Sequence, residues 1–286
     1  MKVIARITGG LGNQLFQYAM GRSMAAQHNA RLLLDLSHYG TAGTHTPRGF
    51  ELGAFNTRFD VATGSDLAPF RPSYTKRMLA RTGLLPGPRI VHQAGFGVDP
   101  AILDARPPVY LDGTWQSERY FAMCSGALRS ELTLKDPLSG EAAALATNLR
   151  SQPSVSVHVR RGDYAHDPKT RDYHGLLGTA YYTAAMQWML ERVPDAHFFV
   201  FSDEPRWAHE HLQASTPMTV LPVRSGPEDL LLMAQCRHHI IANSSFSWWG
   251  AWLNPSERKL VVAPQRWFAD ATINTNDLIP GSWTRL

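Results

Sequence analysis

Residues 155–164 place an apolar strand directly before a cluster of charge. Valines alternate along the strand, and Arg160, Arg161 and Asp163 follow it at once. Ligands of open α/β sheets bind just beyond the carboxyl ends of strands, where a guanidinium can hold a phosphate through two hydrogen bonds. The stretch therefore predicts a phosphate or pyrophosphate site. The alternative is an ion pair with only a structural role at the strand end.

Two later strands also end in polar residues. Asp203 or Glu204 can accept hydrogen bonds from the N1–H and amino group of a guanine. Ser244, Ser245 and the free N–H groups at the start of the following helix can bind an anion. Both motifs also fit simple helix caps. Because parallel strands bring their carboxyl ends to one rim, the clusters together predict a nucleotide diphosphate site, with the members His158, Arg160, Arg161, Asp163, Ser202, Asp203, Glu204, Asn243, Ser244, Ser245, Phe246 and Ser247.

The N-terminal region contains a glycine-rich turn after a predicted strand. Gly10 and Gly12 match a dinucleotide-binding fingerprint, but its third glycine position holds Leu15, so the fingerprint fails. Asn13 and Gln14 open the next helix. Their amides can bind a sugar, and the backbone N–H groups there favour an anion. The alternative is a tight strand–helix connection.

Trp115 and Gln116 follow another predicted strand. An aromatic face beside an amide suits a sugar, because the ring packs against C–H groups while the amide bonds to hydroxyls. A tryptophan buried in the core is the alternative. The later tryptophans 248, 249 and 252 share a short predicted helix over 246–253, and we expect most of that cluster to be core.

The positioning elements predict two α/β halves, residues 1–150 and 151–286. In the first half we expect strands at 2–7, 31–35 and 109–113 and helices at 14–28 and from 117 to about 131. The boundary lies within segment 134–153. In the second half, five strands alternate with helices, which is typical of a parallel, doubly wound sheet. These strands are expected at 155–159, 197–201, 218–222, 239–243 and 259–263, with a polar loop at 162–175.

Composition narrows the function. The chain has 286 residues, a net charge of +4 and 44% hydrophobic residues, which argues for a folded protein with an anionic ligand and against disorder. Without a Lys/Arg-rich run, nucleic acid is not expected as a partner. The two cysteines are far apart and predict a cytoplasmic protein with reduced thiols. The basic segment 69–90 is either a solvated face or a contact for a membrane or anionic glycan.

Two motifs are missing from the sequence. No Gly-x-x-x-x-Gly-Lys-Ser/Thr motif and no Asp-x-Asp pair occur, so neither a P-loop nor the usual carboxylates for a metal-bound diphosphate are present. Without a metal, arginine and helix N-termini would have to stabilise a leaving diphosphate.

With these motifs together, the chain resembles the family 11 glycosyltransferases, the inverting α-1,2-fucosyltransferases. The resemblance runs nearly end to end and adds Tyr164 and His174 to the candidate site. The matching segments, in order, are residues 9–18, 111–118, 158–164, 174–175, 181–182, 201–204 and 243–252.

The resemblance implies a GT-B fold, in which two Rossmann-like domains face each other across a cleft. The donor would be GDP-β-L-fucose, bound by the second domain, and neither a metal nor another cofactor would be needed. The acceptor would be a terminal β-galactose on a glycan or lipid-linked glycan facing the first domain. A bacterial enzyme of surface polysaccharide or O-antigen synthesis follows, cytoplasmic, with peripheral contact with the inner membrane as an alternative.

The implied reaction is a single displacement by the galactose 2-hydroxyl. Arg160 would stabilise the departing diphosphate, Asn13 would reach toward fucose or phosphate, and His158 would touch ribose or guanine unless it is structural. Asp163 is the first candidate for the general base, although pairing with an arginine would argue against it. Asp167, His166 and His174 are the alternates.

Three rival functions fit parts of the sequence. A non-catalytic glycan-binding protein explains the tryptophans, and an oxidoreductase explains Asp35 and the first glycines. A GT-B transferase that uses another nucleotide sugar explains nearly everything and is the strongest rival.

Overall fold

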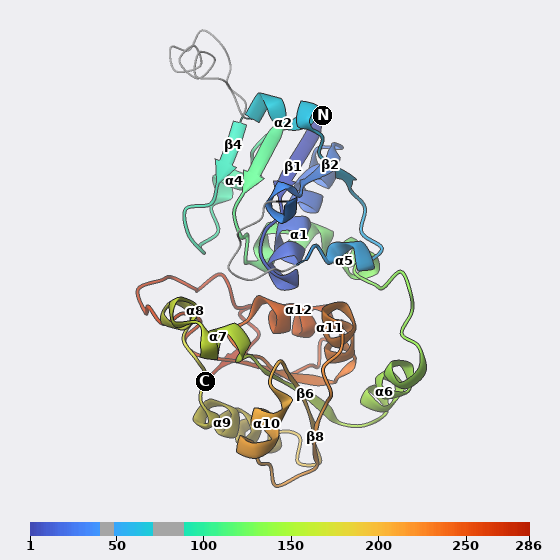
Figure 1. The fold of residues 1–286 in the computed structure, drawn as a ribbon, viewed down its shortest axis with the longest axis vertical. Helices are drawn as coiled ribbons and strands as arrows, with labels where there is room; N and C mark the ends of the chain where they lie inside the picture. The colour runs from blue at the N-terminus through green and yellow to red at the C-terminus, as the bar shows by residue number, and fades with distance from the viewer. Residues whose placement is uncertain (41–48, 71–88) are drawn as a thin grey trace. The chain divides into compact units, whose positions relative to one another are not determined.

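The computed structural model describes residues 1–40, 49–70 and 89–286 (Figure 1). The chain divides into two compact units, residues 1–133 and 134–286. The division precedes the expected boundary at 150, because helix α6 (Gly140–Ser151) packs Ala146 and Leu149 into a core of the second unit. Within the basic segment 69–90, residues 71–88 lie outside the described part.

Unit 1 is built on a five-stranded parallel sheet in the order β3-β2-β1-β5-β4. Its central strands are short and apolar and are buried along most of their length, as expected for a sheet covered on both faces. The strands are β1 (Lys2–Arg6), β2 (Arg31–Asp35), β3 (Asp60–Val61), β4 (Arg89–His92) and β5 (Val109–Asp112).

Helices connect and flank these strands. The long helix α1 (Leu11–Gln27) starts earlier than the expected 14–28. The helix expected from 117 to 131 is instead two 3₁₀ turns, Glu118–Tyr120 and Ala122–Cys124, followed by α5 (Ser125–Glu131). Ser117 caps the first turn and not a continuous helix. Among the described residues, the other short α-helices of this unit are α2 (Gly64–Leu67) and α4 (Pro100–Leu103).

Unit 2 is built on a six-stranded parallel sheet in the order β11-β10-β9-β6-β7-β8. The sequence predicted five of these strands and missed β11, which has only two residues. The strands are β6 (Ser154–Val159), β7 (His197–Ser202), β8 (Met218–Val220), β9 (His238–Ile240), β10 (Val261–Ala263) and β11 (Thr284–Arg285).

Strand β7 shows why this sheet has helices on both faces. Successive side chains of a strand point to opposite faces. Phe198 and Val200 pack against residues of α9 (Thr179–Leu190) and α10 (Pro205–His211). Phe199 and Phe201 pack against α6 and α11 (Gly226–Gln235). The unit is therefore doubly wound, as the sequence predicted, and Figure 1 shows helices above and below its strands.

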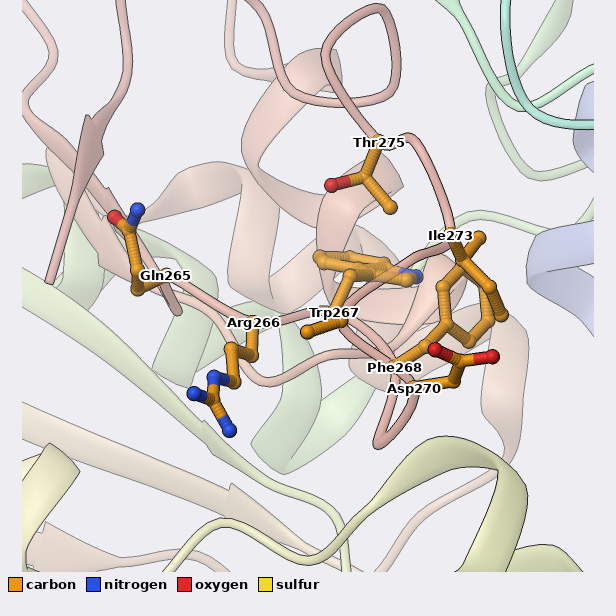
Figure 2. A pocket seen from close by; sticks show the side chains of 8 residues that line it. Gln265, Arg266, Trp267, Phe268, Asp270, Ile273 and Thr275 are labelled. Atoms are coloured by element: carbon orange, nitrogen blue, oxygen red, sulfur yellow. The ribbon is translucent and has the colours of Figure 1, made fainter.

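The carboxyl side of this sheet also carries short helices. The expected polar loop 162–175 is folded into α7 (Gly162–His166) and α8 (Pro168–His174). Helix α12 (Ser245–Leu253) buries Trp248, Trp249 and Trp252, so that cluster is core, as expected. After β10, residues 265–275 line a cavity of about 340 Å³ (Figure 2).

No helix within residues 1–40, 49–70 and 89–286 combines the length and the apolar character needed to cross a membrane.

Candidate active site

The strand order of unit 2 places the predicted rim at a topological switch point. From β6 the chain moves to β7 and β8 on one side, and later to β9 and β10 on the other. The loops that follow β6 and β9 therefore leave the sheet in opposite directions and open a crevice between them, which is where ligands of such sheets bind. These two loops carry Arg160 and Asn243, so the structure brings the first and third predicted clusters together.

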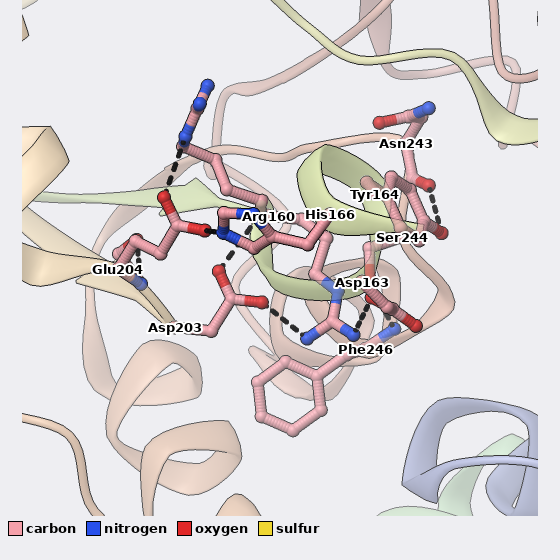
Figure 3. Close-up of polar contacts among 11 residues, drawn as sticks. Arg160, Asp163, Tyr164, His166, Asp203, Glu204, Asn243, Ser244 and Phe246 are labelled. Carbon is pink, nitrogen blue, oxygen red and sulfur yellow. Dashed lines mark hydrogen bonds and ion pairs between the residues drawn. The ribbon is translucent and has the colours of Figure 1, made fainter. Parts of the chain in front are cut away.

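Arg160 lies between two carboxylates, as Figure 3 shows. Its Nη1 is 2.7 Å from Asp203 Oδ2, and its Nη2 donates to Asp163 Oδ1. The guanidinium also lies over the ring of Tyr164, 5.5 Å from the centroid. The Arg160 side chain is 22% exposed. A guanidinium has five N–H donors. The two carboxylates therefore orient Arg160 without using all of its donors.

The Arg160 pairing bears on the general base. The alternative stated for Asp163 was an ion pair with an arginine, and this ion pair is present. A carboxylate that already holds a guanidinium is poorly placed to take a proton from a substrate hydroxyl. The interpretation of Asp163 as first candidate for the base stays a prediction, and this ion pair argues against it. The contacts of Asp163 fit a side chain that positions Arg160.

The alternate bases also have structural contacts. Asp167 caps α8 by accepting from Lys169 N and Thr170 Oγ1. His166 Nε2 is 2.8 Å from Glu204 Oε1. The His174 ring stacks on Tyr164, with centroids 4.6 Å apart. The structure thus singles out none of the four as the base.

Arg161 is tied into the fold. Its Nε donates to Glu204 Oε2 at 3.0 Å, its guanidinium stacks over Trp207 at 4.0 Å, and its backbone N donates to Asp203 Oδ1. Together with His166 and Arg160, these contacts occupy every carboxylate oxygen of Asp203 and Glu204. Each of these oxygens can accept a second hydrogen bond, so acceptance from guanine by Asp203 or Glu204 stays a prediction.

The serine motifs at the strand ends act partly as caps. Ser202 Oγ accepts from Glu204 N, Ser244 Oγ accepts from Phe246 N, and Ser247 Oγ donates back to Ser244 O. Asn243 Nδ2 donates to His174 O at 2.8 Å and to Trp267 O at 3.3 Å. Its Oδ1 is buried and has no partner among the described residues. Asn243 therefore fixes the loop and still offers an acceptor.

His158 is buried at the end of β6 with only 6% of its surface exposed. Burial, with Arg160 nearby, lowers the pKa of His158 to about 3, so its ring is neutral near pH 7. Its Nδ1 has no hydrogen-bond partner in the described part of the chain, and the ring lies 5.5 Å from Phe246. A buried, unpaired nitrogen costs roughly 1–3 kcal/mol, which a ligand hydrogen bond would offset.

The sequence analysis missed Asp229. This residue is in the first turns of α11, which begins beyond the carboxyl end of β8. Its Oδ2 accepts weakly from Arg224 N at 3.4 Å, while Oδ1 is buried without a partner among residues that the structure describes. Burial raises the pKa of Asp229 to about 6. One signal was visible in the sequence: Ser225 and Glu228 form a capping box, which leaves the neighbouring Asp229 unexplained.

In unit 1, the predicted amide side chains make hydrogen bonds within their own unit. Gln14 is fully buried; its amide donates to Gly9 O and Gly49 O and accepts from Glu51 N. Gln116 Nε2 donates to Asn13 Oδ1 at 2.8 Å. Gly10 precedes α1 without a side-chain cap, and Gly12 is buried within the helix. These amides hold loops together.

Trp115 corrects the sugar-platform interpretation. Its side chain is fully buried and meets Tyr120 edge to face, with ring centroids 5.5 Å apart. The indole offers no face to a sugar, so the core alternative holds.

No group of three or more His, Cys, Asp or Glu side chains in the described ranges is placed to hold a metal. Independence from metal stays a prediction.

Comparisons with known proteins agree with the motifs. The glycosyl transferase family 11 model matches residues 97–286. An alpha-1,2-colitosyltransferase from Escherichia coli is 33% identical over 99% of this chain and 98% of its own length. Galactoside alpha-(1,2)-fucosyltransferase 1 from Rattus norvegicus is 34% identical over 51% of this chain and 42% of its own.

One solved structure supports the fold. A mutant of FUT1 from Arabidopsis thaliana, in complex with GDP, aligns with a TM-score of 0.52, covering 91% of this chain and 69% of that one. At 11% identity the likeness concerns fold alone. With the two parallel sheets, it confirms the predicted GT-B class. The end-to-end relative and the family model lead to one conclusion: this chain belongs to glycosyltransferase family 11.

Proposed function

We propose that this chain transfers L-fucose from GDP-β-L-fucose to the 2-hydroxyl of a terminal β-galactose, forming an α-1,2 linkage with inversion and without a metal. The observation that carries the proposal is the switch point of unit 2 in a member of this family. There an oriented arginine, a helix start and unpaired buried polar atoms meet at one rim. The rat relative is named as an enzyme of this type.

The diphosphate would bind at the Arg160 side of the rim. The donors of Arg160 not used by Asp163 and Asp203, together with the N–H groups at the start of α12, suit a dianionic group. During displacement the galactose 2-hydroxyl gives its proton to a base and its oxygen bonds to the anomeric carbon, while the bond from that carbon to the β-phosphate oxygen breaks with its electron pair. Arg160 would stabilise the charge that develops on this oxygen.

The guanine would be held by Asp229. Two neighbouring donors, N1–H and the 2-amino group, identify guanine, and a carboxylate accepts both. The unpaired Oδ1 of Asp229 is such an acceptor, whereas the oxygens of Asp203 and Glu204 have partners. We therefore propose Asp229 in place of those two residues.

A second donor sugar has a specific observation in its favour. A relative that covers this chain almost completely is named a colitosyltransferase. Colitose is fucose without the 3-hydroxyl, so the same diphosphate site would serve GDP-colitose. Which sugar is transferred then depends on whether a site polar group bonds that hydroxyl.

Further parts of the proposal concern the acceptor and location. We propose a galactose-terminated glycan of a bacterial surface polysaccharide or O-antigen as acceptor, with unit 2 as the donor side and unit 1 as the acceptor side. Peripheral contact with a membrane would come from the basic segment 69–90. The support for that contact is the charge of its sequence alone.

Calorimetry and a transfer assay test the proposal. GDP is expected to bind, and UDP and NAD are expected not to bind; GDP-fucose and GDP-colitose are then compared as donors to a β-galactoside, with NMR of the product to read the linkage. Absence of GDP binding overturns the proposal. Transfer of colitose alone would show that the donor is GDP-colitose and not GDP-fucose.

Asp229→Asn tests the guanine contact. GDP affinity should fall about tenfold or more, since an amide cannot accept from both donors, while Asp195→Asn, an exposed aspartate of the same unit, should leave it unchanged. In the wild type, GDP should bind more weakly as pH falls below about 6, because the carboxyl becomes protonated. Unchanged GDP binding by a folded Asp229→Asn variant contradicts this role.

A further inference from the structure

The cavity after β10 is a separate place in unit 2 where side chains suited to a ligand meet. Its lining combines the buried rings of Trp267 and Phe268 with the exposed Asp270 and the half-buried Thr275. Figure 2 shows Thr275 close to the indole of Trp267, with Phe268 and Asp270 on the same side of the loop. Its volume of about 340 Å³ is near the lower end of the roughly 300–1,000 Å³ of small-molecule sites.

Several polar atoms of this lining have no protein partner. Trp267 Nε1 and Thr275 Oγ1 make no hydrogen bond to the described residues, although the backbone oxygens of both residues do accept one. Asp270 Oδ1 accepts from Thr272 N and Thr272 Oγ1, and Oδ2 makes no such bond. The cavity thus presents an indole N–H, a hydroxyl and a carboxylate oxygen around aromatic carbon.

This chemistry favours a neutral sugar. Aromatic rings pack against the C–H faces of a pyranose, and hydroxyls bond to mixed donors and acceptors. Hydrogen bonds from the Thr272 side chain and backbone lower the pKa of Asp270, so its carboxylate is charged near pH 7 and repels a phosphate. The only cation of the lining, Arg266, is exposed and points away from this corner (Figure 2).

The cavity is also linked to the proposed transfer site. Asn243, at the end of β9, donates to the backbone oxygen of Trp267, and β9 and β10 are neighbouring strands. Phe268 contacts the rings of Tyr173 and His174. Asn243 also donates to the backbone oxygen of His174. A sugar in the cavity would therefore sit beside the rim that holds the donor diphosphate.

We propose that the cavity lined by Trp267, Phe268, Asp270 and Thr275 is a subsite for a neutral sugar ring of the acceptor glycan. The proposal rests on the proposed function for the identity of the glycan. Asp270 Oδ2 accepts from a sugar hydroxyl, Thr275 Oγ1 bonds to a second, and the exposed edges of Trp267 and Phe268, each 4% exposed, give a small apolar contact. Unit 2 then contributes to acceptor binding as well as to donor binding.

The test uses a double variant, Asp270→Asn with Thr275→Val, which keeps the side-chain shapes and an acceptor for Thr272. Its matched control is Thr272→Val, which removes a hydroxyl bond to Asp270 Oδ1 but leaves every lining side chain and Asp270 Oδ2 in place. Trp267 is left intact because it is 4% exposed and its loss would endanger the fold. Binding of a β-galactosyl disaccharide is measured by saturation-transfer NMR without any nucleotide, and then KM for acceptor and donor and the rate of donor hydrolysis are measured.

The double variant should bind the disaccharide about tenfold more weakly or worse and raise the acceptor KM by a similar factor, as expected for losing the charge of one hydrogen-bond acceptor and the hydroxyl of a second. Donor KM and donor hydrolysis should match the wild type and the control. Unchanged disaccharide binding, an equal loss in the control, or a loss confined to donor KM or hydrolysis overturns the subsite. Because the NMR arm contains no nucleotide, failure of GDP-fucose as a donor would refute the proposed function while leaving this result readable.

Discussion

Glu131 in unit 1 and Asp229 in unit 2 are both carboxylates drawn away from water, but their surroundings differ. Glu131 is 4% exposed and accepts from Tyr18 Oη at 2.6 Å and from Arg22 Nη2 at 2.9 Å. Asp229 has one weak backbone donor for Oδ2, and its buried Oδ1 has no partner among the described residues. Glu131 belongs to what we call a closed cluster, in which both carboxylate oxygens accept hydrogen bonds from side chains. Asp229 belongs to an open one, in which one oxygen has no partner among the described residues.

A similar contrast holds for the predicted amide side chains of unit 1, although Trp115 Nε1 of that unit is also buried without a partner among the described residues. In unit 1, Gln14 and Gln116 use their amides to bond loops of their own unit. In unit 2, His158 and Asn243 each keep a buried polar atom unpaired within the described structure. A fold gains nothing from an unpaired buried atom, whose desolvation costs roughly 1–3 kcal/mol. Where such atoms lie beside Arg160 at the rim of unit 2 they support a ligand site, while the closed cluster of Glu131 supports stability.

The largest expected effect is at the open rim. Arg160→Ala should lower the transfer rate on the order of 10²–10³ or more, because the leaving diphosphate loses its cation. Arg160→Lys should recover part of the loss, since it restores charge without the fork of donors. Rates, with circular dichroism to check the fold, decide this. Arg206→Ala, which removes an exposed arginine of α10, is the control and should leave the rate unchanged. Near-normal turnover by a folded Arg160→Ala variant would contradict the role of Arg160 in stabilising the leaving diphosphate.

The closed cluster should respond in stability. Glu131→Gln leaves Arg22 without its carboxylate, and we expect a loss of about 2–3 kcal/mol in the free energy of unfolding. Urea denaturation measures this, with Asp60→Asn as the control because it breaks only the exposed pair with Arg31 and should change nothing measurable. The folded Glu131→Gln variant should bind GDP like the wild type. A selective loss of GDP binding would erase the contrast between the units.

The smallest effect concerns pH. His158 has a pKa lowered to about 3, so between pH 6.5 and 3 the unfolded chain binds a proton that the folded chain does not. Its contribution is present above pH 6.5 and is lost as pH falls, with a slope of at most about 1.4 kcal/mol per pH unit. Urea midpoints between pH 7 and pH 5 should fall less steeply for His158→Asn than for the wild type. His209→Asn, at an exposed position, should keep the wild-type slope.

Sequence patterns predicted elements better than contacts. Short apolar segments located β2 at its observed bounds and five of the six strands of unit 2. The two-residue β11 and the short helices α7 and α8 were missed, because segments this short carry too little periodicity. The structure divides the chain at residue 134, the first residue of the predicted boundary segment 134–153, and only the packing of α6 assigns that helix to unit 2.

By itself the sequence determined the α/β class, the family motifs and Arg160 at the end of a strand, since these depend on residues close together along the chain. The tertiary structure decided which polar groups are already paired. It joined Arg160 to Asp163 and Asp203, buried Trp115 and left an oxygen of Asp229 without a partner among the described residues. The physical reason is that desolvation and hydrogen bonding act over a few ångströms between side chains from distant segments, and only the folded chain brings those segments together.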